Sequence, residues 1–149
     1  MLALIAHDAK KDDMVMLLKA HREELTEVNL VATRGTGQLV EARMGLMVTL
    51  LQDGRRGGDQ QIGALVANGQ VGAVIFLRDP LTAQPHEPDI WALLRVCDVH
   101  DVPLATNPAT AGAVLHLFLE RVKVPIGDEF MGKLGNKYPA FLNEMLTKR

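Results

Sequence analysis

The stretch with the clearest chemical content is Gly57-Gly58-Asp59-Gln60-Gln61, in which two glycines precede a carboxylate and two amides. A short apolar run over residues 48–51 ends just before it, and an amphipathic run over 62–66 follows at once. This order predicts a strand, a glycine loop and a helix start, with Asp59 in the first turn. A helix N-terminus attracts anions, so this loop could bind an anionic ligand. A carboxylate is not needed for such binding, and its presence beside an anion-binding loop indicates chemistry on a phosphorylated or otherwise anionic small molecule.

The elements that would position this acid follow an alternating pattern. Apolar runs predict strands over residues 2–6, 29–32, 48–51, 73–77 and 102–105, and helical patterns lie between and after them, over about 10–21, 38–43, 59–68, 89–100 and 109–120. The prediction is an α/β fold: a single-domain three-layer sandwich with a five-stranded, mainly parallel sheet and helices on both faces. Pro103 suggests that the last strand lies at an edge or begins there. Polar clusters follow every strand, so we expect an active site at the carboxyl edge of the sheet.

The cluster after the second strand, Thr33-Arg34-Gly35-Thr36-Gly37, resembles a phosphate cradle, because glycines let the backbone approach an anion and hydroxyls donate to it. It is not a P-loop, since no Gly-Lys-Ser/Thr follows. Lys11, one turn into the first helix, could reach the same edge or could be a solvated surface lysine. Asp8 and Asp79 end strands directly, and either could instead hold a loop by accepting backbone N–H groups.

The fourth cluster ends in His86-Glu87-Pro88-Asp89. Asp89 could orient the His86 ring and fix its tautomer, or it could be an N-cap or first-turn acid of the next helix. His86 could also be an ordinary loop histidine. The remaining histidines do not cluster, so no zinc site is expected.

Composition narrows the function classes. The 149 residues are 48% hydrophobic and carry a net charge of −2, which gives no general attraction to nucleic acid or to an anionic membrane. Cys97 is the single cysteine and lies in an apolar pattern, so it is expected to be a buried, unpaired thiol. The absence of serine excludes a serine hydrolase. No signal or membrane-spanning pattern is seen, and a cytoplasmic protein is expected.

These motifs together resemble the methylglyoxal synthase family over about residues 1–112, in order and without large gaps. The matching segments are Ala6-His7-Asp8, Lys11, Gly57-Gly58-Asp59-Gln60-Gln61-Ile62-Gly63-Ala64, Asp79-Pro80-Leu81, Pro85-His86-Glu87-Pro88-Asp89, Leu93-Leu94-Arg95 and Pro103-Leu104-Ala105-Thr106-Asn107.

The resemblance implies a cofactor-free and metal-free lyase that converts dihydroxyacetone phosphate to methylglyoxal and inorganic phosphate, a glycolytic bypass. It implies Asp59 as the general base, His86 at the substrate oxygens and Asp89 in support of proton movement. It also implies a cytoplasmic homohexamer that phosphate inhibits. The residues expected to line the pocket or contact substrate and phosphate are His7, Asp8, Lys11, Thr33, Gly35, Thr36, Asp53, Gly54 and Asp79.

Two segments depart from the family pattern. The family usually has Thr-Gly-Thr-Thr-Gly after the second strand, where this chain has Arg34 and Gly35 at the second and third positions. It usually has Ser-Gly-Pro before the two glycines, where this chain has Asp53-Gly54-Arg55. An ionised Asp53 would repel a dianionic phosphate, and Arg34, Arg55 or Arg56 could offset that repulsion.

Two further expectations concern the C-terminal region and rival functions. We expect an α/β domain over residues 1–121 and a divergent tail over 122–149 with a short helix at 140–146. Arg121 and Arg149 are candidates for the arginine that the family lends to a neighbouring subunit. The alternative function is a phosphate- or anion-sensing binding module of the same fold. A response-regulator receiver is disfavoured because Thr106-Asn107 stands where a lysine is needed.

Overall fold

The computed structural model describes residues 1–123. The chain divides into two units, Met1–Leu119 and Glu120–Arg149, and the account below concerns the first. The short helix predicted at 140–146 lies outside the described residues, and the domain boundary after residue 121 stays a prediction. Within residues 1–123 no helix is long and apolar enough to cross a membrane.

The sheet has five strands in the order β3-β2-β1-β4-β5, and every neighbouring pair is parallel. The predicted α/β fold is thereby confirmed, with a sheet that is parallel throughout. As the proline indicated, β5 is an edge strand that begins after Pro103. The strands are β1 (Leu2–Ala6), β2 (Leu30–Ala32), β3 (Val48–Leu50), β4 (Ala73–Leu77) and β5 (Leu104–Ala105).

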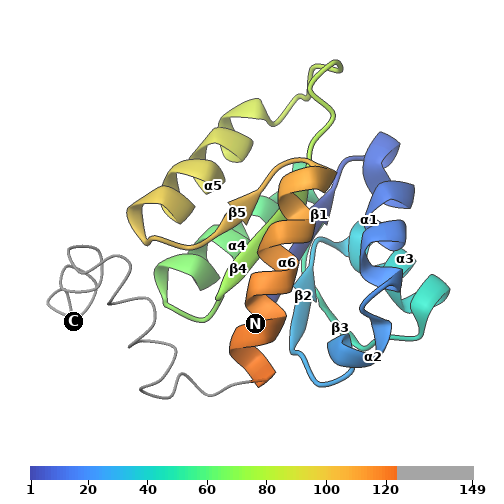
Figure 1. Ribbon diagram of the computed structural model, residues 1–149. Coiled ribbons are helices and arrows are strands. Elements are labelled where there is room, and N and C mark those ends of the chain that lie inside the picture. Colours follow the sequence, from blue (N-terminus) through green and yellow to red (C-terminus); the bar gives the residue numbers. More distant parts are fainter. Residues whose placement is uncertain (124–149) are drawn as a thin grey trace, which may run out of the picture. The chain divides into compact units, whose positions relative to one another are not determined.

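Helices cover both faces of the sheet (Figure 1). The central strands β1 and β4 consist of apolar residues, and because helices pack on both faces these residues are all buried. One apolar cluster joins β1 and β2 to α1, α3 and α6, and a second joins β1 and β4 to α4 and α5. The helices are α1 (Lys11–Lys19), α2 (Arg22–Leu25), α3 (Arg34–Met44), α4 (Gly58–Ala67), α5 (Glu87–Val99) and α6 (Pro108–Lys123), with short 3-10 turns η1 (Asp8–Lys10) and η2 (Gly54–Arg56).

Helix α3 begins at Arg34, four residues before the predicted start near residue 38. The glycines that suggested a loop belong to its first turn. A Cβ on Gly37 would lie 2.3 Å from Leu50 Cδ2, so this glycine lets α3 pack closely on β3. The helix predicted over about residues 10–21 ends at Lys19, and the short helix α2 follows it.

The order of the strands creates a crevice beside β1. The chain adds β2 and β3 on one side of β1 and then crosses to add β4 and β5 on the other side. In a parallel sheet, such a reversal separates the loops that follow the two strands at the switch and leaves room for a ligand. His7 and Arg78 are the first residues after β1 and β4, so they flank this position.

Candidate active site

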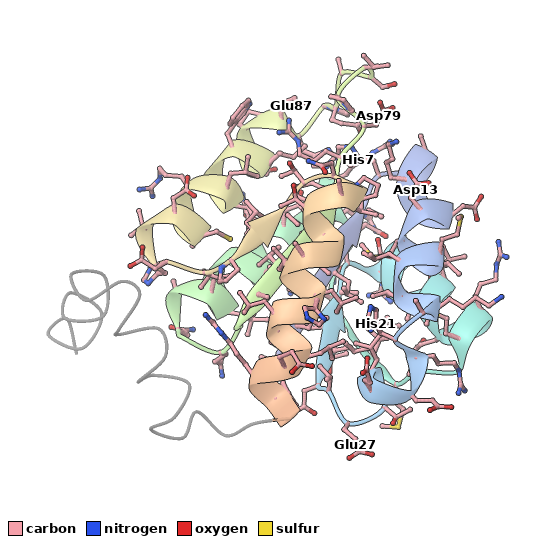
Figure 2. All side chains as sticks on the ribbon, in the orientation of Figure 1. His7, Asp13, His21, Glu27, Asp79 and Glu87 are labelled. Carbon is pink, nitrogen blue, oxygen red and sulfur yellow. The ribbon has the colours of Figure 1, made fainter. Side chains whose placement is uncertain are left out.

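A cavity of about 680 Å³ opens at the carboxyl edge of the sheet. Figure 2 shows His7, Asp79 and Glu87 together at this end of the sheet, whereas His21 and Glu27 lie toward the other end. Of the predicted site residues, all but Asp89 line the cavity: His7, Asp8, Lys11, Thr33, Gly35, Thr36, Asp53, Gly54, Asp59, Asp79 and His86. The expectation that these clusters converge on one edge is therefore met in the structure.

Asp59 is the most unusual group in the cavity wall. It lies in the first turn of α4, is 1% exposed, and neither carboxylate oxygen has a hydrogen-bond partner in the described chain. Burial raises the pKa of Asp59, the nearby His86 opposes this shift, and the charge of Asp89 adds to it. An unpartnered buried carboxylate is costly to a fold, so its presence in a cavity indicates a group kept for chemistry.

The loop before α4 passes close to this carboxylate at Gly54. A Cβ on Gly54 would lie 3.1 Å from Asp59 Oδ1 and 3.4 Å from His86 Nε2. The loop is held against the helix by the Asp53 carbonyl, which accepts the N–H groups of Arg56 and Gly58. Gly54 thus keeps open the space in front of the base.

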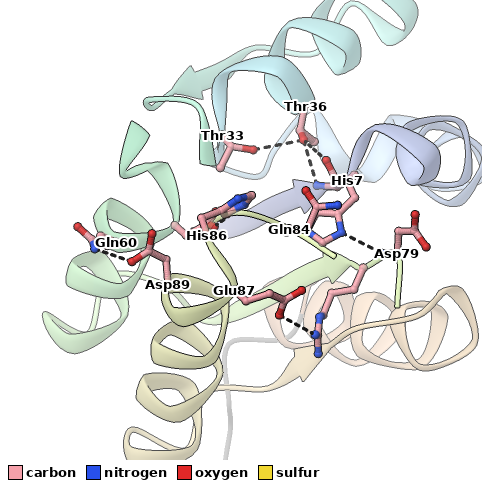
Figure 3. Close-up of polar contacts among 12 residues, drawn as sticks. His7, Thr33, Thr36, Gln60, Asp79, Gln84, His86, Glu87 and Asp89 are labelled. Carbon is pink, nitrogen blue, oxygen red and sulfur yellow. Dashed lines mark hydrogen bonds and ion pairs between the residues drawn. The ribbon is translucent and has the colours of Figure 1, made fainter. Parts of the chain in front are cut away.

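His86 stands at the start of α5, where its carbonyl accepts the N–H groups of Asp89 and Ile90. Its Nε2 lies 3.6 Å from Asp59 Oδ2, and its Nδ1 is buried without a hydrogen-bond partner among the described residues. The possibility that Asp89 orients this ring is therefore not supported. Asp89 Oδ1 instead accepts a hydrogen bond from Gln60 Nε2 at 2.8 Å (Figure 3), and Asp89 is one of the two first-turn acids of α5, with Glu87.

His7 is held as a neutral imidazole by the backbone. The N–H of Asp79 donates to His7 Nδ1 at 2.9 Å, so this nitrogen must be unprotonated and the ring proton must be on Nε2. His7 Nε2 is buried and has no hydrogen-bond partner in residues 1–123. Burial lowers the pKa of His7, and the nearby His86 and Arg78 lower it further. His7 therefore offers one N–H donor to a ligand in the cavity.

The opposite wall of the cavity has the properties of an anion site. The first turn of α3 leaves backbone N–H groups without intrahelical partners, as every helix start does. A Cβ on Gly35 would lie 3.1 Å from Lys11 Nζ, which places the ammonium group at this same turn. The Thr33 hydroxyl also faces the cavity, and it donates to Thr36 Oγ1 at 3.3 Å.

Two of the predicted ligand contacts already have structural partners. Thr36 Oγ1 accepts the N–H of Ala6 at 3.0 Å, which ties α3 to the end of β1. Asp79 Oδ1 accepts the N–H of Leu81, so the loop-holding alternative raised for Asp79 is seen here. The loop-holding alternative for Asp8 is not seen, because its side chain is 80% exposed and pairs with Lys11 Nζ at 2.6 Å.

The cavity also contains residues that the sequence motifs did not identify. Thr82 and Gln84 line it from the loop between β4 and α5, and Arg55 and Arg56 line it from η2. The sequence predicts for these two arginines only that they could offset the charge of Asp53. The sequence did not indicate Thr82 or Gln84, because residues in a loop do not follow the regular spacing that identifies one face of a helix or strand. Within the described residues, no cluster of three or more His, Cys, Asp or Glu side chains could hold a metal.

The fold and this cavity define an MGS-like domain, and the model of that family matches residues 13–106. Methylglyoxal synthase of Moorella thermoacetica is 60% identical over 114 residues, which cover 76% of this chain and 89% of that protein. Methylglyoxal synthase of Burkholderia ambifaria is also 60% identical over 114 residues, covering 76% and 88%. The crystal structure of methylglyoxal synthase from Elizabethkingia anophelis matches with a TM-score of 0.72 at 46% identity, covering 76% of this chain and 75% of that one. The chain belongs to the methylglyoxal synthase family, and the resemblance drawn from its motifs is confirmed.

Proposed function

We propose that this chain is a carbon–oxygen lyase that converts dihydroxyacetone phosphate to methylglyoxal and inorganic phosphate. The observation that supports it most is Asp59, a buried carboxylate with two unpartnered oxygens in a cavity that also holds an anion site. The names of the relatives support the same reaction, since each is a methylglyoxal synthase.

The first step is removal of a proton from the hydroxymethyl carbon beside the carbonyl. Asp59 takes this proton, and its raised pKa makes it a stronger base than an ordinary aspartate. A carbon acid of this kind is weak, so the carbonyl oxygen must be stabilised as negative charge develops on it. The neutral His7 can donate its Nε2 proton to that oxygen, and His86 stands beside Asp59 to contact the substrate oxygens.

The second step is loss of phosphate from the resulting enediolate. The hydroxyl proton on the terminal enediolate carbon passes to the other enediolate oxygen. The electron pair left on the terminal oxygen then forms the aldehyde C=O bond, the former C=C pair forms a double bond to the phosphate-bearing carbon, and the carbon–oxygen bond to phosphate breaks, which gives the enol of methylglyoxal. This enol then takes up a proton at its terminal carbon to give methylglyoxal. The breaking bond must stand perpendicular to the enediolate plane, and an anion site on a rigid helix end can set that angle. Lys11, Thr33 and the backbone of the first turn of α3, at Gly35 and Thr36, are proposed to hold the phosphate, with Gly54 beside it.

Other parts of the proposal follow from the family. We propose that phosphate binds as product and inhibitor, that the assembly is a homohexamer, and that the protein works in the cytoplasm. Asp89 is proposed to assist proton movement through its charge near Asp59. An arginine from a neighbouring subunit would complete the phosphate site, and of its two candidates Arg149 lies outside the described residues.

The test is to incubate the purified protein with dihydroxyacetone phosphate and to measure methylglyoxal and phosphate. Equal amounts of both products are expected, and Asp59→Asn is expected to abolish them while still binding inorganic phosphate in calorimetry. A wild-type protein that makes no methylglyoxal at high substrate concentration would refute the lyase. Phosphate binding without turnover would instead favour the anion-sensing module.

A further inference from the structure

A polar contact between two helix starts lies just behind the proposed catalytic groups. Gln60, in the first turn of α4, donates from Nε2 to Oδ1 of Asp89, in the first turn of α5, at 2.8 Å. Figure 3 shows this pair between the two helices, with the His86 ring at the start of α5. Neither Gln60 nor Asp89 lines the cavity.

The two partners are each fixed to a catalytic group by the backbone. Gln60 follows Asp59 directly, and both lie in the same helical turn. Asp89 lies three residues after His86, and its N–H donates to the His86 carbonyl at 3.0 Å, so these two residues form one turn as well. The hydrogen bond between Gln60 and Asp89 therefore links the turn that carries Asp59 to the turn that carries His86. It limits how far the two turns can move apart, and so it helps to hold Asp59 Oδ2 and His86 Nε2 at 3.6 Å.

Among residues 1–123, other side-chain contacts near His86 do not join the first turns of α4 and α5. Glu87, in the first turn of α5, pairs with Arg78 at 3.8 Å and so ties this turn to the residue that follows β4. The His86 ring lies edge-on to His7, with ring centroids 6.2 Å apart, and its Nδ1 has no hydrogen-bond partner in residues 1–123. The buried apolar contacts of α4 and α5 include Ile62 and Ile90, which hold the bodies of the helices. The first turns, where the catalytic groups stand, are joined by the amide and the carboxylate.

We propose that Gln60 is a positioning residue that acts through Asp89: their hydrogen bond fixes the start of α5, and with it His86, relative to Asp59. The acceptor is charged, which shortens and strengthens a hydrogen bond, and Gln60 is exposed, so the main effect of the bond is on the geometry of the two helix starts and not on the stability of the fold. It also holds the charge of Asp89 in place near Asp59. This proposal rests on the proposed function, because the separation of Asp59 and His86 matters for turnover only if they act on substrate.

The first test replaces Gln60 by methionine, which keeps the length of the side chain and removes the donor. We expect kcat to fall by about 3- to 30-fold with KM changed by less than about twofold, because misplacement of a catalytic group acts on the chemical step. Gln60→Glu should be slower still, since it sets two carboxylates against each other. Gln38→Met is the matched control: Gln38 is an exposed glutamine on α3 whose side chain makes no hydrogen bond to residues 1–123, and kcat should stay at the wild-type value.

The second test separates position from chemistry. In the double variant Gln60→Glu/Asp89→Asn, the asparagine amide can donate to the new carboxylate and restore a bonded pair. We expect this double variant to match the kcat of Asp89→Asn alone, so that Gln60→Glu is harmful only opposite Asp89. An equal loss in both backgrounds would show that the residues act independently and would overturn the proposal.

A readout without substrate distinguishes failure of this inference from failure of the lyase. The imidazole resonances of His86 can be followed by NMR in the ligand-free protein, with thermal melts to show that each variant is folded. Gln60→Met should shift the His86 resonances and Gln38→Met should not, whether or not the protein makes methylglyoxal. Unchanged His86 resonances together with an unchanged kcat in folded Gln60→Met would refute the positioning role.

Discussion

Replacing Gly54 by alanine adds one methyl group beside the two groups proposed to move the proton. The new Cβ would lie 3.1 Å from Asp59 Oδ1, 3.4 Å from Asp59 Oδ2 and 3.4 Å from His86 Nε2. A substrate carbon must come to about 3–3.5 Å from the base before its proton can be taken. The methyl group would therefore occupy the space that the reacting carbon needs.

The size of the effect follows from this crowding. Two carbons are comfortable only at about 3.5–4 Å, so the substrate or the carboxylate must move by an appreciable fraction of an ångström. A misplacement of about 1 Å lowers a rate by about 10²-fold, which corresponds to about 2.7 kcal/mol of transition-state stabilisation. We expect kcat/KM of Gly54→Ala to fall by at least that factor. The methyl should also displace water from Asp59 and raise its pKa further, because burial already raises it.

Stability should change little, and this separates the effect from unfolding. Gly54 does not have a positive φ, so alanine can adopt the backbone conformation. The loss of unfolded-state entropy favours the variant by about 0.4–1 kcal/mol, and the tight contacts offset part of that gain. Gly112→Ala in α6 is the control, since a Cβ there meets no atom within 4 Å. That variant should gain about 1 kcal/mol and keep its activity.

The assay compares methylglyoxal production and urea unfolding for the wild type and both variants. A Gly54→Ala protein that is folded and retains kcat/KM within about threefold of the wild type would refute the reasoning. It would mean that the reacting carbon does not approach Asp59 from the side of Gly54. A loss of activity that accompanies a large loss of stability would instead show that the loop, and not the space in front of the base, had been damaged.

Four further results are expected. Asp53→Ser should lower the phosphate inhibition constant by roughly threefold or more, because a carboxylate in the cavity wall repels a dianion; an unchanged constant would show that Asp53 points away from the phosphate. Gly58→Ala should destabilise the fold by about 2–4 kcal/mol in urea unfolding, since its Cβ would lie 2.1 Å from the Gln52 carbonyl oxygen; near-wild-type stability would contradict the close approach. Because burial raises the pKa of Asp59, the folded state binds that proton more tightly than the unfolded state, and ionised Asp59 destabilises the fold at neutral pH. Asp59→Asn should therefore raise the melting temperature at pH 7–8; this gain should begin to shrink as the pH falls through the folded-state pKa and should vanish below the unfolded-state pKa. A lower melting temperature at pH 7–8 would argue against a buried carboxylate without hydrogen bonds. Burial raises the pKa of Cys97 to about 11, so a thiol reagent at pH 8 should react only after unfolding, and rapid labelling of the folded protein would contradict this.

The fold was predictable because each strand is a short apolar run followed by a break. The buried runs of β1 and β4 leave little choice but a parallel sheet covered on both faces. The start of α3 was misplaced because Gly35 and Gly37 look like loop residues in sequence. Glycine stands at these two positions because other parts of the chain pack closely there: Gly37 packs against Leu50, and Gly35 packs against Lys11. Both partners are distant in the sequence. Periodicity within one segment carries no information on such contacts.

The sequence predicted where the site lies in the fold, but it did not predict the hydrogen bonds that its residues make. Asp59 and His86 could be singled out because glycine, proline and histidine stand beside acids at a strand end. The partner of Asp89 could not be inferred, because Gln60 is 29 residues away and is reached only by the packing of α4 on α5. The tautomer of His7 depends on the N–H of Asp79, 72 residues further on. Hydrogen bonds of this kind are set by the register of the strands and not by local sequence.

The order of the strands also places the residues of the proposed reaction on two different helical layers. Lys11, Thr33 and Gly35 come from the layer of α1 and α3, whereas Asp59 and His86 come from the layer of α4 and α5. His7 directly follows β1, the strand at the reversal of strand order, and so stands between them. In the proposed reaction, a substrate bound across this edge would have its phosphate on one layer and its acidic carbon on the other. The bond that must break then lies over the sheet, and its angle is fixed by two rigid layers instead of one flexible loop.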